Sequence, residues 1–176
     1  DLMSDSDPCC VLDASVLIDL VAGDLLLEFQ GLPFAVGIPD VIEQEEITQE
    51  PAVTELSKLV YETIHFEARH YDTVIRLRSE NTAISISDLF AFIAARERQD
   101  VLITGDNNLR RLAEDEGVEV HGVLWVLDEL VRLKSIGPLR AAQALKDILN
   151  KGSYLPPEEC ERRFKKWGAP SDFWQS

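Results

Sequence analysis

The sequence predicts an α/β fold in which helices flank a mainly parallel central sheet, followed by a C-terminal helical extension. Short apolar runs, typical of strands buried on both faces, alternate along the chain with longer segments of helical spacing. This alternation favours parallel strands, because each helix carries the chain back to the starting edge of the sheet. The chain has 176 residues, of which 45% are hydrophobic, and this is enough for one domain with a core and an appendage.

The first predicted strand covers residues 10–12. A helix is expected over 14–22, because Gly23 after it is a good stop residue. Glycines and prolines bound a second strand at 34–38, and Pro39 suits the first turn of the next helix. The other elements of this half are a short helical piece at 24–29, a helix at 52–60, a strand at 63–66 and a helix that ends near residue 78.

The second half begins with a strongly apolar helix at 89–97, for which Ser87 or Asp88 is the expected N-cap. A short apolar strand follows at 101–103, after a turn. The remaining predicted elements of the domain are a helix at 107–116, a short strand at 118–120 and a helix at 122–134.

A tail with two further helices follows the break at Gly137-Pro138. Its apolar residues recur at helical spacing, so the tail is expected to pack on the domain or on a partner chain, and a homodimer is one expectation. These two helices are predicted at 140–149 and 158–167. The predicted organisation is a flexible leader at 1–8, a domain at 9–135 and a helical extension at 136–176.

Composition narrows the possible partners and compartments. The chain carries 17 basic and 32 acidic residues, giving a net charge of −15. This charge disfavours a nonspecific coat on nucleic acid, because phosphate binding needs positive charge. Three cysteines are too few for a disulfide framework and favour a reduced, cytoplasmic setting. The apolar runs are too short to cross a bilayer, so no membrane partner is expected.

Acidic residues recur where predicted strands and helices meet. Asp13 and Asp106 each follow a buried strand, so they should face one another at the carboxyl edge of the sheet, where open α/β folds bind ligands. Asp88 and one acid from the cluster at 43–46 add further carboxylates. Oxygen ligands suit Mg²⁺ or Mn²⁺, and such a cation would relieve the repulsion among crowded carboxylates. A bound metal would activate a water and stabilise charge on a phosphate oxygen.

Each of these residues also has a simpler interpretation. An Asp at a helix start is commonly an N-cap, and Asp88 taken alone is explained as well by capping as by a metal site. Most of the acids between Glu43 and Glu50 are expected to lie on a solvated helix face. Ser15 and Thr104 are ordinary turn residues, although they could also hold the acids by hydrogen bonds.

Three motifs follow one another along the chain. They are Val11-Leu12-Asp13-Ala14-Ser15-Val16-Leu17-Ile18, Ser87-Asp88 at the start of an alanine-containing helix, and Leu102-Ile103-Thr104-Gly105-Asp106-Asn107-Asn108-Leu109. Their order and spacing resemble the PIN domain family over residues 9–135. The tail, with Gly152-Ser153-Tyr154-Leu155-Pro156 between two helices, resembles the C-terminal extension of a bacterial subgroup of that family.

The resemblance implies a Mg²⁺- or Mn²⁺-dependent nuclease that acts on RNA. Such proteins are often VapC-like toxins, each neutralised by an antitoxin protein. Asp13, Asp88 and Asp106 match the first, third and fourth acids of the family.

The second acid of the family lies on the helix after the second strand. Glu45 fits best, because its distance along the chain from Pro39 and Ile42 keeps the family's spacing. Glu43 and Glu46 stay open as alternatives for this position.

The preferred hypothesis is an endoribonuclease of PIN type in which Asp13, Glu45, Asp88 and Asp106 hold the metal and hydrolyse phosphodiester bonds. The alternative is a catalytically silent scaffold or regulatory binding protein on the same fold, favoured by the negative charge and the amphipathic tail. The basic candidates for steering an RNA strand are Arg96, Arg98, Arg110 and Arg111.

Overall fold

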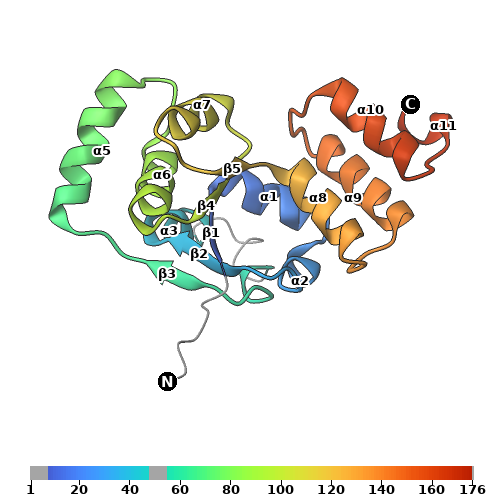
Figure 1. The fold of residues 1–176 in the computed structure, drawn as a ribbon, viewed down its shortest axis with the longest axis horizontal. Helices are drawn as coiled ribbons and strands as arrows, with labels where there is room; N and C mark the ends of the chain where they lie inside the picture. Colours follow the sequence, from blue (N-terminus) through green and yellow to red (C-terminus); the bar gives the residue numbers. More distant parts are fainter. Residues whose placement is uncertain (1–7, 48–54, 176) are drawn as a thin grey trace.

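The computed structural model describes residues 8–47 and 55–175. Its centre is a parallel sheet of five strands in the order β3-β2-β1-β4-β5 (Figure 1). The strands are β1 (Cys9–Leu12), β2 (Ala35–Pro39), β3 (Glu62–Ile64), β4 (Val101–Ile103) and β5 (Val120–His121). The predicted α/β class with a parallel sheet is therefore confirmed.

The strand order reverses at the middle of the sheet. In β1, Val11 pairs with Gly37 of β2 on one side and with Leu102 of β4 on the other. The chain moves from β1 to β2 and β3 in one direction, and then returns past β1 to form β4 and β5. The carboxyl ends of β1 and β4 thus meet at a topological switch point, which is the usual ligand position in open α/β sheets.

Helices cover both faces of this sheet (Figure 1). Helix α6 contacts β1, β2 and β4, whereas α1 packs against α8 and α9. Right-handed crossovers place α1 and α6 on opposite faces, because their connections run in opposite directions along the sheet. The helices are α1 (Ala14–Ala22), α2 (Leu26–Phe29), α3 (Asp40–Ile47), α5 (Ala68–Glu80), α6 (Ile86–Arg98), α7 (Asn107–Asp115), α8 (Val123–Arg132), α9 (Pro138–Asn150), α10 (Pro157–Lys166) and α11 (Ser171–Trp174).

The core centres on β1 and α6. Val11 and Leu12 are completely buried, as expected for a strand between two helical layers. All residues of α6 from Leu89 to Ala95 are buried, because this helix lies between the sheet and α5. The predicted apolar segments at 10–12 and 89–97 therefore form the centre of the molecule.

Some element boundaries differ from prediction. Helix α6 begins at Ile86, and its N-cap is Ser85, whose hydroxyl accepts the amide hydrogen of Asp88 at 3.1 Å. The predicted N-cap at Ser87 or Asp88 is therefore wrong. Asp88 lies inside the first turn of α6, and its carboxylate is not the N-cap of the helix. Pro39 ends β2 and does not begin a helix. The predicted helix at 52–60 falls partly outside the described residues, and α11 was not predicted.

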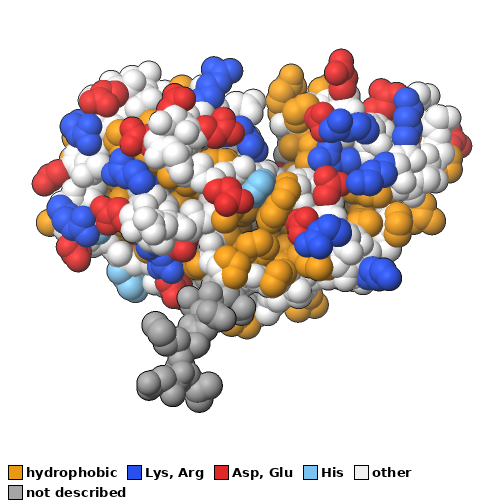
Figure 2. All heavy atoms as spheres, in the orientation of Figure 1, with side chains coloured by type: hydrophobic (Ala, Val, Ile, Leu, Met, Phe, Trp, Pro, Cys, Tyr) orange, Lys and Arg blue, Asp and Glu red, His pale blue; other side chains and the backbone are white. Residues whose placement is uncertain are grey.

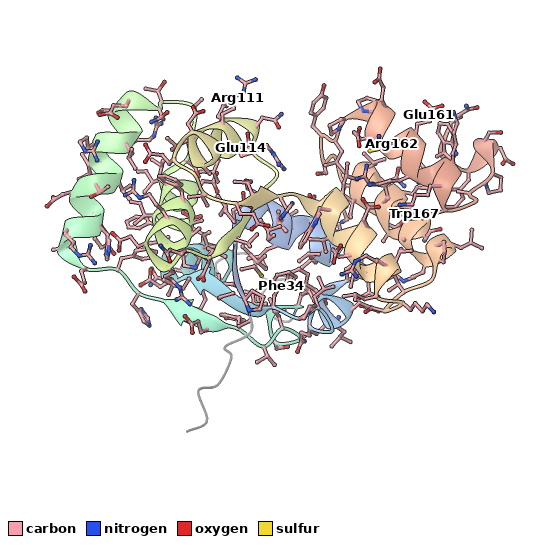
Figure 3. The ribbon with its side chains drawn as sticks, in the orientation of Figure 1. Phe34, Arg111, Glu114, Glu161, Arg162 and Trp167 are labelled. Atoms are coloured by element: carbon pink, nitrogen blue, oxygen red, sulfur yellow. The ribbon has the colours of Figure 1, made fainter. Side chains whose placement is uncertain are left out.

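The C-terminal tail packs on the domain. Its apolar face is buried through Leu145, Ile148 and Phe164, and Trp167, which directly follows α10, is also buried (Figure 3). Arg163 on α10 donates to Asp128 Oδ2 on α8 from Nε at 3.1 Å and from Nη2 at 2.7 Å. Of the two expected arrangements, the structure thus shows the one in which the tail packs on its own domain. A homodimer stays a prediction.

Cysteines and membrane-spanning helices are two further points of the fold. In the structure Cys9, Cys10 and Cys160 are free thiols. Of the helices that the structure describes, none combines the length and the apolar character needed to cross a membrane. The predicted leader at 1–8 lies outside the described residues apart from Pro8.

The Arg163–Asp128 contact gives a first prediction. Arg163→Gln should lower the free energy of unfolding by about 1–3 kcal/mol, because Asp128 would lose a charged hydrogen-bond partner in a half-buried position. Its neighbour Arg162, labelled in Figure 3, is the matched control, because its side chain is 68% exposed. Arg162→Gln should change stability by less than about 0.5 kcal/mol. Urea denaturation measures both, and equal losses would contradict the assigned role.

Candidate functional site

Asp13 stands at the end of β1 and caps α1. Its Oδ1 accepts the amide hydrogen of Val16 at 2.9 Å and the hydroxyl hydrogen of Ser15 at 2.8 Å. Its Oδ2 accepts the hydroxyl hydrogen of Thr104 from the neighbouring strand end. The backbone amide of Asp13 donates to the carbonyl of Ile103 at 3.2 Å. These contacts hold a fully buried carboxylate at the boundary between β1 and β4.

Asp106 takes the equivalent position after β4. Its Oδ1 caps α7 by accepting the amide hydrogen of Leu109 at 2.8 Å. Its own amide donates to the hydroxyl oxygen of Thr104 at 3.0 Å. Thr104 therefore joins the two sites, since the same hydroxyl donates to Asp13 and accepts from Asp106. Both acids act as N-caps, and each has further oxygen lone pairs.

Ser15 makes a second link across the switch point. Its hydroxyl donates to Asp13 and accepts the amide hydrogen of Gly105 at 3.0 Å. A Cβ atom at Gly105 would lie 3.0 Å from Ser15 Oγ, so the glycine permits this close approach. Ser15 and Thr104 thus fix the loops that follow β1 and β4 relative to one another.

Asp88 and Glu45 bring further negative charge to this edge. Burial is the main cause that raises the pKa of the Asp88 carboxyl, a hydrogen bond with Ser85 opposes it, and the charges of Asp106 and Glu45 add to the rise. The structure therefore brings all four predicted acids within electrostatic range of a neighbour in the group. Burial also raises the pKa of Asp13 to about 7, although hydrogen bonds from Thr104, Val16 and Ser15 lower it, and the charge of Asp88 raises it further.

The structure describes the side chains of two of the three candidates for the second acid, Glu43 and Glu45. Glu43 Oε2 accepts the hydroxyl hydrogen of Thr63 at 2.8 Å, and this contact turns its carboxylate toward β3. Glu45 influences Asp88 electrostatically, whereas the side chain of Glu46 lies outside the described part of the chain. These observations support Glu45 over Glu43 as the acid that faces Asp88.

The donor set has the chemistry that a hard divalent cation needs. Among the residues that the structure describes, no group of three or more His, Cys, Asp and Glu is close enough to enclose a metal ion alone. Mg²⁺ usually keeps several waters and takes one or two carboxylates from the protein. Burial raises the pKa values of Asp13 and Asp88, neighbouring carboxylates add to the rise, and a divalent cation would stabilise the ionised forms of both groups. The residues therefore fit a hydrated Mg²⁺ or Mn²⁺.

A cavity of about 330 Å³ lies beside the acids, and the sequence did not reveal it. It is lined by Thr104 and Gly105 from the switch point, by Arg110 of α7 and by Tyr154 of the tail. The tail motif around Tyr154 was visible in the sequence, but its position against α7 depends on tertiary packing.

The four arginines that were candidates for steering RNA have different surroundings. Arg96 pairs with Glu116, and Arg98 pairs with Glu62 and Asp100. Arg111 projects from α7 away from the rest of the molecule (Figure 3). Of this set, Arg110 lines the cavity.

Comparison with known proteins agrees with this architecture. The family model DUF3368, described as a PIN domain, matches residues 9–169. The match covers the parallel sheet, all four predicted acids and the helices α9 and α10 of the tail. A search of curated proteins found no match. Because the model spans nearly the whole chain, the protein belongs to the PIN domain family.

Proposed function

We propose that this protein is a Mg²⁺- or Mn²⁺-dependent endoribonuclease that hydrolyses phosphodiester bonds of RNA. PIN domains are generally nucleases and generally use divalent metals. The observation that carries the proposal is the placement of Asp13 and Asp106 after adjacent strands, joined through Thr104, with Asp88 and Glu45 within electrostatic range. The buried carboxylate of Asp13 is costly for the fold when it is ionised, and a bound cation reduces that cost.

The proposed roles of the residues follow from their contacts. Asp13, Glu45, Asp88 and Asp106 would hold the metal, which when bound supplies a water of lowered pKa and neutralises charge on the phosphate. Asp13 is the best-oriented of the four, since three hydrogen bonds fix its carboxylate. Asp106 is fixed on α7 and is linked to Asp13 through Thr104.

Ser15 and Thr104 are proposed as positioning residues. Neither carries charge, and the hydroxyl of each donates to the carboxylate of Asp13. Such contacts orient a ligand carboxylate and set which of its lone pairs stay available. The toxin role and an antitoxin partner belong to the same proposal and rest on the resemblance to VapC-like proteins. A small upstream reading frame that encodes a DNA-binding protein would support them.

The alternative function is a scaffold without turnover. The net charge of −15 favours it, because a polyanionic surface repels RNA. The two functions differ in one measurable property, since a scaffold needs no divalent metal.

Cleavage of a labelled single-stranded RNA in Mn²⁺ tests the nuclease directly. Asp13→Asn and Asp106→Asn should each lower the cleavage rate at least about 100-fold, because each substitution removes charge that holds the metal. Asp72→Asn is the matched control, since Asp72 is exposed on α5, and it should cleave at the wild-type rate. Equal rates in all four proteins would contradict the proposal and identify any activity as a contaminant.

The raised pKa of Asp13 predicts how stability depends on pH. Its ordinary value is 3.8 and its value in the folded protein is about 7, so the folded state holds the proton more tightly than the unfolded state. Ionised Asp13 therefore destabilises the fold above pH 7, and this penalty disappears as the pH falls toward 4. The gap corresponds to on the order of 4 kcal/mol.

Asp13→Asn keeps an N-cap oxygen and removes the charge. In EDTA, its gain in stability over the wild type should be larger at pH 8 than at pH 4.5, by on the order of 3 kcal/mol. Asp19, whose pKa burial raises to about 6, affects both proteins alike and cancels from the comparison. Urea denaturation at the two pH values measures the difference, and a pH-independent gain would show that Asp13 is not a buried anion.

Metal binding should reverse this penalty in the wild type. At pH 8, Mn²⁺ at a hundred times its Kd should raise the free energy of unfolding by about 2.7 kcal/mol. Asp106→Asn should lose most of this gain, whereas Asp72→Asn should keep it. Thermal denaturation with and without Mn²⁺ measures the effect. A wild-type Tm that does not respond to Mn²⁺ would favour the scaffold.

A further inference from the structure

The cavity beside the acids has no assigned role in the proposed hydrolysis. We call it the Tyr154 cavity, and we define it by Thr104, Asn107, Arg110, His121, Trp125 and Tyr154. Figure 2 shows the surface hollowed between the part built by α7 and the part built by α10, with hydrophobic side chains along the floor. Thr104 belongs both to this cavity and to the hydrogen-bond link between Asp13 and Asp106. A ligand in the cavity would therefore contact the loop that carries Asp106, since Gly105 and Asn107 on either side of this acid line the cavity.

Aromatic rings give the cavity flat, apolar walls. The ring of His121 stacks on Trp125 with centroids 4.1 Å apart and an interplanar angle of 10°. Phe34 supports Trp125 from the other side through an edge contact at 5.8 Å. Tyr154 is 83% exposed, which is unusual for so large a side chain in a loop tied between two packed helices. An exposed tyrosine opposite a stacked aromatic pair is a suitable platform for a planar ligand.

Arg110 supplies positive charge to the same space. Arg163 also lines the cavity, but Asp128 and Glu159 neutralise its guanidinium. Within residues 8–47 and 55–175, the ion pair of Arg110 is a long contact of 3.9 Å with the exposed carboxylate of Glu114. A Cβ atom at Gly122 would lie 3.0 Å from Arg110 Nη2, so the guanidinium rests against the backbone at the start of α8. It is therefore held at the wall of the cavity and can pair with an anion there.

We propose that the Tyr154 cavity binds one unstacked nucleotide of a single-stranded RNA, adjacent to the phosphodiester at the carboxylates. Tyr154 and the His121–Trp125 pair would stack on the base, and Arg110 would pair with a phosphate. Asn107, exposed directly after Asp106, offers an amide for the base edge. The volume of about 330 Å³ is at the lower end for small-molecule sites, so it suits one nucleotide and excludes a duplex. This inference rests on the proposed nuclease function and names its substrate as single-stranded RNA.

Binding without cleavage tests the cavity separately from the chemistry. Fluorescence anisotropy of 5′-labelled eight-residue RNAs (rA8, rC8 and rU8) is measured with the full chain in EDTA. Tyr154→Ala should weaken binding of at least one RNA by about 5-fold or more, because a stacking partner is lost. Tyr154→Phe keeps the ring and should bind like the wild type.

Arg110 is tested through the salt dependence of the same binding. Arg110→Gln should reduce the slope of log K against log salt by about 0.7, the value for one phosphate contact on a single strand. Arg76 on α5, whose side chain is 61% exposed, is the control. Arg76→Gln should leave the slope unchanged.

The outcomes separate the cavity from the nuclease. If the wild type cleaves RNA in Mn²⁺ while Tyr154→Ala binds and cleaves RNA equally well, the cavity inference is overturned and the nuclease stands. If the wild type binds RNA, and Tyr154→Ala does not, the cavity inference is supported even where no cleavage is found, and only the nuclease proposal fails. If the wild type neither binds nor cleaves RNA, both proposals fail.

Discussion

The hydroxyl of Thr104 is the contact on which the arrangement of the site depends. It donates to the carboxylate of Asp13 after β1 and accepts the amide hydrogen of Asp106 after β4. These two strands are neighbours because β2 and β3 are added on one side of β1, whereas β4 is added on the other side. Asp13 and Asp106 are 93 positions apart in the chain and are tied by one side chain between them. The fold thus places two carboxylates at one edge of the sheet, and burial makes the charge of Asp13 unfavourable without a counter-ion.

The helical tail extends this site. Arg163 joins α10 to α8, and the buried faces of α9 and α10 fix the loop that carries Tyr154. This loop faces α7 across the hollow seen in Figure 2, so the tail supplies one wall of a cavity whose other wall is the switch point. A role in holding substrate would explain why an exposed tyrosine is presented there. Arg110 would then supply positive charge for a phosphate at this cavity, although the chain as a whole is acidic.

Sequence patterns predicted the parts of this structure that depend on local order. The buried strands and the acids that follow them were visible because an apolar run that stops at an aspartate defines both the strand and its edge. Asp88 was placed near a helix start, but its cap was misassigned, since Ser85 and Ser87 are both good N-caps and only the geometry selects Ser85. The preference for Glu45 over Glu43 depends on the contact between Glu43 and Thr63 of β3, which the sequence does not show, and Glu46 stays an alternative. The Tyr154 cavity could not be predicted, because its walls come from segments that meet only after the tail has packed.

The central claim is that carboxylates distant in the sequence share one hard cation. A crystal structure grown with Mn²⁺, with anomalous diffraction recorded near the manganese edge, locates that ion directly. The account predicts one strong anomalous peak at the carboxyl ends of β1 and β4, within about 2–2.5 Å of oxygens from Asp13 and Asp106 or of waters bound to them. A map in which saturating Mn²⁺ leaves this edge without a peak, or places the ion elsewhere on the acidic surface, would contradict it.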